Sequence, residues 1–112
     1  MTDRELLELA ARAAGAKAYE WMVGPEWELG DAVFVVNFGN GREAWNPLDN
    51  DGDALRLAVN LRLTVKIEDH EIEVFNWEGC LVSTGMFGGD DYEAATRCAI
   101  VRAAAEIGRN MK

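Results

Sequence analysis

Apolar residues at helical spacing predict a helix at the start of the chain, over residues 2–16. Thr2 and Glu5 have the spacing of a capping box, in which each side chain satisfies a backbone N–H of the first turn. Gly15 is placed to end the helix. The residues that form its apolar stripe are Leu6, Leu9, Ala10, Ala13 and Ala14.

A second amphipathic pattern predicts a longer helix over residues 90–109. Asp90 and Glu93 have the spacing of a capping pair, and Gly108 fits the helix end. Glu93 and Arg97 form an i,i+4 pair of the favourable polarity. The stripe of this helix has small residues in its middle: Tyr92, Ala95, Ala99, Ala103 and Ile107.

Between these helices, the first strand signal is the run 32–38, whose β-branched and aromatic residues predict a strand buried on both faces. A turn at 39–41 leads to a second strand from Arg42 to Trp45, and Pro47 ends that ladder because it has no N–H to donate. Residues 17–31 interleave aromatic and acidic residues around a Gly24-Pro25 breaker; the stretch could begin as a strand, but we predict mostly loop there.

The segments 63–68 and 71–78 predict a hairpin with Asp69-His70 as a two-residue loop. That loop fixes the register, and opposite charges then meet on one face while aliphatic residues meet on the other. A final strand over 79–84 pairs back through a turn at Glu78-Gly79. The expected partners are Ile67 with Ile72, Lys66 with Glu73, and Val65 with Val74.

An acidic turn over residues 49–53 precedes a short helix predicted from about 52 to 61. Either Asp51 or Asp53 is suited to cap it, and Leu55, Ala58 and Val59 fall on one side. The alternating aspartates also suggest calcium. However, Ala54 stands where an EF-hand loop needs glycine, and Asn60 stands where it needs glutamate. Helix capping explains these acids without a metal.

Composition indicates an ordinary globular chain. Its 112 residues correspond to one domain (1–112), with 49% hydrophobic and 28% charged residues. No apolar run is long enough to span a membrane, and the charged N-terminus has no secretion signal, so a cytoplasmic location is expected. Cys80 and Cys98 are therefore expected as reduced, largely buried thiols.

The net charge of −9 argues against direct binding to nucleic acid, which needs Lys and Arg to replace counterions. Residues 20–53 carry eight acids and one base, and residues 68–93 carry eight acids and no base. Bases concentrate on the helical stretches. The charge is compatible with a basic partner surface or with solubility alone.

Candidate chemistry is sparse. Trp21, Trp27, Trp45 and Trp77 could line a pocket, although such residues more often cover the edge of a small core. The only histidine, His70, is expected at a hairpin tip without a nucleophile motif. The loop 85–89 lacks a phosphate-loop pattern. The sequence thus points to no catalytic residue, cofactor or metal.

Two segments suggest a family. Trp45-Asn46-Pro47-Leu48, followed by the segment 51–59 with the sequence D-G-D-A-L-R-L-A-V, resembles the signature of the phage α-β-α sandwich domain family. Segments 2–10 and 97–105 are similar to that family too. The resemblance implies a small phage or prophage protein in which helices cover a central antiparallel sheet. It implies no reaction and no catalytic residues.

The expected fold is therefore α/β (α+β). Terminal helices would pack on one face of a mainly antiparallel sheet of about five strands, with the short helix near the other. Two functions remain open. One is a non-enzymatic phage accessory protein that binds a host or phage protein through an acidic surface. The other is a small-ligand-binding domain or enzyme with a tryptophan-lined pocket. A homodimer is expected if an aromatic sheet face stays uncovered.

Overall fold

The computed structural model describes residues 2–22, 33–86 and 91–111, and these form an α+β fold. The helices are α1 (Asp3–Ala13), α2 (Asp51–Asn60) and α3 (Tyr92–Arg109). One antiparallel sheet has the order β1 (Ala18–Met22), β2 (Val33–Asn37), β3 (Arg42–Ala44). The other has the order β4 (Thr64–Ile67), β5 (Glu71–Phe75), β6 (Leu81–Met86).

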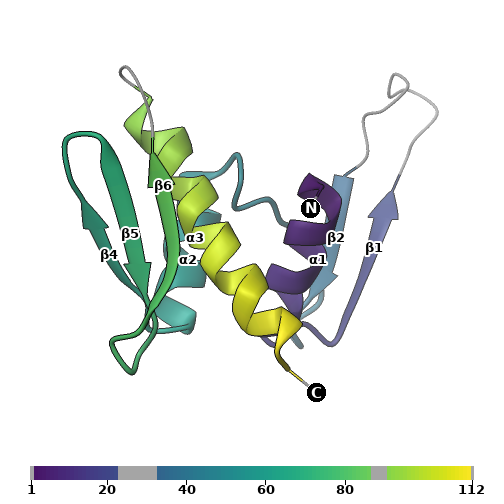
Figure 1. Cartoon of the computed structure of the whole chain (residues 1–112). Helices are drawn as coiled ribbons and strands as arrows, with labels where there is room; N and C mark the ends of the chain where they lie inside the picture. Colours follow the sequence, from purple (N-terminus) through teal and green to yellow (C-terminus); the bar gives the residue numbers. More distant parts are fainter. Residues whose placement is uncertain (1, 23–32, 87–90, 112) are drawn as a thin grey trace.

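The helices form the middle layer between the two sheets (Figure 1). The expected single sheet of about five strands is not confirmed, since the six described strands divide into two sheets of three. The expected layer order also differs, because α1 and α3 pack on each other and each faces a different sheet. Pro47 and α2 carry the chain from β3 to β4, and this detour separates the two sheets.

The main core joins α1, α2, the inner face of α3 and the first sheet. It centres on side chains such as Leu7, Val36, Leu57 and Val101, all nearly or fully buried. A smaller cluster lies on the other side of α3, where Ala99 and Ala103 contact Ile72 and Val74 of β5. The small residues of α3 thus let one helix pack against neighbours on two sides.

Each helix has a polar N-cap, as predicted, but in two helices the capping residue is not the predicted one. The Thr2–Glu5 capping box of α1 is confirmed. In α2 the cap is Asn50, whose Oδ1 accepts from the Asp53 N–H at 2.8 Å, so the prediction of Asp51 or Asp53 is wrong. In α3 the cap is Asp91, and the predicted Asp90 lies outside the described residues. All three caps are polar side chains at positions that local sequence brings close to free N–H groups.

The hairpin of β4 and β5 has the predicted register. Lys66 lies opposite Glu73, Val65 opposite Val74, and Ile67 opposite Ile72. Because Ile72 and Val74 are fully buried, the aliphatic face must point inward and the charged face outward. The turn before β6 is also confirmed at Gly79, whose φ of +85° is readily adopted by glycine.

Two strand predictions need correction. Residues 18–22 form β1, so the stretch predicted as mostly loop begins as a strand, which was the alternative, because Trp21 and its neighbours pair with β2. The strand 33–37 is buried on one face alone: Phe34 and Val36 are buried, whereas Val33 and Val35 are half-buried. The helices cover only the inner face of this sheet, and the outer face carries an ion pair between Glu20 and Arg42.

Candidate functional site

Trp21 and Trp45 come together around Phe34 in the first sheet. The Trp21 ring stacks on Phe34 at 4.5 Å, and Trp45 lies tilted to it at 6.2 Å. Trp21 also donates its indole N–H to Glu8 at 2.8 Å and lies under the guanidinium of Arg4. Trp45 is 6% exposed and belongs to the main core. These contacts are those of a packed aromatic cluster.

The four-tryptophan pocket is not assembled by the described residues. Trp27 lies outside them. Trp77 is 71% exposed in the turn between β5 and β6, and it borders a hollow of about 580 Å³ with Asn60, Arg62 and Asn110. A different hollow, of about 310 Å³, lies between Trp21, Trp45 and the acidic turn. The structure therefore places Trp77 apart from the other two.

The aspartates of the acidic turn make contacts within the chain. Asp53 accepts from the backbone N–H of Asn46 at 3.0 Å and pairs with Arg56 at 2.8 Å. Asp51 pairs with Arg97 of α3 at 2.5 Å. No group of three or more His, Cys, Asp or Glu within residues 2–22, 33–86 and 91–111 could hold a metal ion. The turn serves to join α2 to the strand before it and to α3.

Arg97 makes the contact that spans these elements. Its Nε donates to the Leu48 carbonyl at 2.9 Å, while its guanidinium pairs with Asp51. The predicted pairing of Arg97 with Glu93 is thus replaced by one with α2. The Arg97 side chain is 17% exposed, whereas its partner Asp51 is 73% exposed, so the ion pair lies at the surface. Glu93 is left exposed on the first turn of α3.

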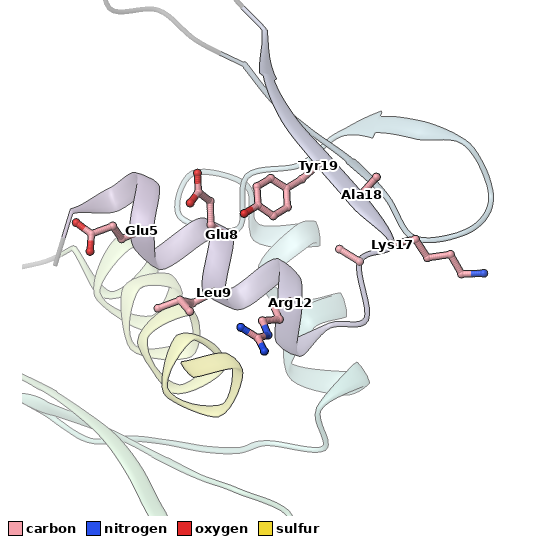
Figure 2. A pocket seen from close by; sticks show the side chains of 8 residues that line it. Glu5, Glu8, Leu9, Arg12, Lys17, Ala18 and Tyr19 are labelled. Carbon is pink, nitrogen blue, oxygen red and sulfur yellow. The ribbon is translucent and has the colours of Figure 1, made fainter. Parts of the chain in front are cut away.

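A groove of about 400 Å³ lies between α1 and β1. Figure 2 shows Glu8 and Tyr19 turned toward the same space, while Lys17 points away. Two of its charged groups already have partners, because Glu8 accepts from Trp21 and Arg12 donates to the Met111 carbonyl at 2.8 Å. Two acids, Glu5 and Glu8, and two bases, Arg12 and Lys17, line it, so its formal charges cancel.

A second groove, the α2–β4 groove, is mainly apolar. It has a volume of about 310 Å³ and lies where α2, β4 and the start of α3 meet. Leu55 and Ile67 line it although they are 65% and 54% exposed. Tyr92 lines it as well, with its hydroxyl donated to the Asp69 carbonyl at 3.2 Å. The charged residues that line it are Asp51, Glu93 and Arg97.

Val59 extends this apolar surface along α2. It lies one turn after Leu55 and is 68% exposed. The buried side of α2 consists of Ala54, Leu57 and Ala58, so of the three residues predicted to share one side, only Ala58 is buried. The sequence does contain a signal for this exposed surface. Helix α2 has apolar residues on two sides, and only one side is needed for the core.

Acidic side chains surround the one lysine on the outer face beside this groove. Lys66 of β4 pairs with Glu68 at 2.9 Å and with Glu73 at 3.8 Å. The hydrogen bond from Lys66 to Glu68, then the negative charges of Glu68 and Glu73, raise the pKa of Lys66 above 10.5. Glu71 adds to the same field. The outer face near β4 therefore has an excess of negative charge.

The remaining candidates are unremarkable. His70 is exposed in the β4–β5 turn, as predicted. Cys80 and Cys98 are free thiols, but Cys80 is exposed and Cys98 half-buried, so the expectation of two largely buried thiols is wrong. Cys80 lies in the loop before β6, which no helix covers. No helix in the described part of the chain is long and apolar enough to cross a membrane.

Comparison with known proteins adds no relative. No protein-family model, curated protein or solved structure matches the chain.

Proposed function

We propose that the chain is a non-enzymatic accessory protein of a phage or prophage. It binds another protein through the α2–β4 groove and acts in the cytoplasm of the bacterial host. The observation that carries the proposal is the pair of large aliphatic side chains, Leu55 and Ile67, exposed on either side of one groove. Burying such side chains against a partner releases about 25 cal/mol per Å² of apolar surface.

The charge around the groove indicates the kind of partner. Asp51 and Glu93 line the groove, and Arg97 is already paired with Asp51. Glu68, Glu71 and Glu73 surround Lys66 on the adjoining outer face. A basic protein surface complements this arrangement and gains in association rate from it, whereas an acidic partner is repelled. The partner is therefore a basic protein with apolar residues at its contact surface.

The phage origin rests on the sequence resemblance of segments 45–48 and 51–59. The first segment follows β3, and the second forms most of α2. The same α2 contributes Leu55 to the groove. The segment that carries the resemblance is thus also the one that supplies the proposed binding residue.

A Leu55→Asp variant is expected to lose the partner. The substitution puts a carboxylate into an apolar contact and removes most of the buried area of the leucine, so retention falls by about tenfold or more. The test compares proteins captured from bacterial host lysate by the wild-type chain and by the variant. Because Leu55 is exposed, the variant should keep its fold.

Leu81→Asp is the matched control for this experiment. Leu81 is 50% exposed at the start of β6, outside the groove, and its substitution adds the same charge. The proposal predicts a partner retained by the wild type and by Leu81→Asp but lost by Leu55→Asp. Equal retention by all three chains, or no partner above background, would contradict it.

A small-ligand function is the second candidate, and the exposed Trp77 supports it. This ring lies at a hollow with Arg62 and three carboxamide side chains, those of Asn60, Asn76 and Asn110. Such a set suits a flat, polar molecule that stacks on the indole. A thermal-shift screen of metabolites and nucleotides tests it. Stabilisation by one compound that disappears in Trp77→Ala would favour this function over protein binding.

A further inference from the structure

The free edge of β4 presents unpaired backbone groups. In the described sheet β4 pairs with β5 alone. The Glu68 N–H donates to the Glu71 carbonyl at 2.8 Å, which makes these two a hydrogen-bonded pair. Pairs alternate in an antiparallel ladder, so the N–H and C=O groups of Lys66 point to β5. Those of Val65 and Ile67 point away from it, to the free edge.

The side chains of β4 divide between the two faces in the same alternation. Val65 and Ile67 lie opposite the buried Val74 and Ile72, so they belong to the inner face. Ile67 borders the α2–β4 groove there. Lys66 lies on the outer face with Glu73. A strand added beside β4 would therefore direct alternate side chains into the apolar groove and toward the glutamates.

We propose that β4 binds its partner by strand addition, and that the bound segment is extended and alternates apolar with basic residues. The proposal rests on the function proposed above and specifies how the groove is used. Apolar side chains of the segment lie beside Ile67 and Leu55. Its Lys or Arg side chains lie on the outer face near Glu68, Glu71 and Glu73.

Charge complementarity selects this occupant over a second copy of the chain. Antiparallel pairing of two β4 edges would bring together two outer faces, each with three glutamates around one lysine. Like charges across neighbouring strands are destabilising. A basic strand supplies the missing positive charge and hydrogen bonds to Val65 and Ile67 at the same time.

A synthetic peptide of about eight residues that alternates lysine with valine serves as the probe, because strands are commonly of this length. In antiparallel addition, the valines opposite Val65 and Ile67 carry the N–H groups that face β4. N-methylation of the valines should weaken binding by at least about tenfold, since it removes these donors and crowds the edge. N-methylation of the lysines is the matched control and should change affinity by less than about threefold.

Amide hydrogen exchange of the full chain gives an independent readout. At a peptide concentration about ten times the Kd, exchange of the Val65 and Ile67 amides should slow by about tenfold. The Lys66 amide, which faces β5, should change much less and serves as the internal reference. Replacing the lysines of the peptide by glutamates should abolish the effect.

Three results would overturn the proposal. The first is equal loss of affinity with either methylated peptide, the second is no binding of the parent peptide, and the third is a homodimer in solution whose β4 edge is already protected. The experiments can refute strand addition without refuting protein binding through the groove. A Leu55-dependent lysate partner together with an inactive peptide would refute strand addition alone.

Discussion

Gly108→Ala is expected to destabilise the protein by at least about 2 kcal/mol, because α1 and α3 leave no room for a side chain there. A Cβ at this position would overlap the carbonyl oxygen of Leu9. It would also lie 2.9 Å from the carbonyl carbon of Leu9 and 3.3 Å from the Ala13 nitrogen. These neighbours are backbone atoms, so the two helices would have to separate.

Helix propensity and packing predict opposite signs for the stability change in Gly108→Ala. Alanine has the better helix propensity by up to about 1 kcal/mol, so a glycine without a packing role would give a more stable variant. Thermal unfolding should show a Tm lower by about 10 °C or more. Gly52→Ala in α2 is the control, since its Cβ would meet only the side-chain ends of Asn50 and Arg56. A stabilised Gly108→Ala variant would contradict the close α1–α3 contact.

Trp45→Ala is expected to cost about 3–5 kcal/mol, the usual range for removing a large buried aromatic side chain. The indole lies edge-on to Phe38 at 5.6 Å and tilted to Phe34 at 6.2 Å. Its loss leaves a cavity between the first sheet, α1 and α2. Urea unfolding measures the change in the free energy of unfolding, which is a large part of the total for a domain of this size.

Trp77→Ala is the matched control for that measurement. It removes the same side chain from a position that is 71% exposed, so the free energy of unfolding should change by less than about 0.5 kcal/mol. Equal losses for the two variants would show that Trp45 is not the anchor of the first sheet. Unfolding monitored by tryptophan fluorescence distinguishes the two environments directly.

Local sequence signals predicted the local structure well. The two-residue loop at Asp69-His70 fixed the β4–β5 register, because a shift of one residue would expose Ile72 and Val74. The capping box at Thr2 was read from side-chain spacing alone. In α2, however, Asn50 and the neighbouring aspartates are all competent caps, so residue type alone could not show that Asn50 takes the position.

The arrangement of the two sheets could not be read from the same signals. Each hairpin is encoded locally, but nothing in a hairpin sequence states whether its edge joins another sheet. Gly108 is an example of a long-range contact that local sequence does not indicate. Its place near the end of α3 suggested a helix terminus, whereas its absent side chain is used for contact with Leu9 and Ala13, nearly a hundred residues earlier in the chain.

The proposed binding site was missed for a similar reason. The spacing of Leu55, Ala58 and Val59 predicts that they share one side of the helix, but it does not say whether that side is buried. The structure buries Ala54, Leu57 and Ala58, and leaves Leu55 and Val59 outside. Trp21 and Trp45, predicted as pocket residues, are held in an aromatic cluster. Exposed aliphatic residues are the better indication of a partner.

The central claim is that the α2–β4 groove is the protein-binding surface, and an amide NMR footprint of the full chain with its captured partner tests it most directly. We predict that shift changes concentrate on Leu55, Val59, Ile67 and Thr96, the residues in or beside the groove. Changes centred instead on Glu8, Arg12 and Tyr19, or on Trp77 and Asn110, would place the partner at another hollow and contradict the claim.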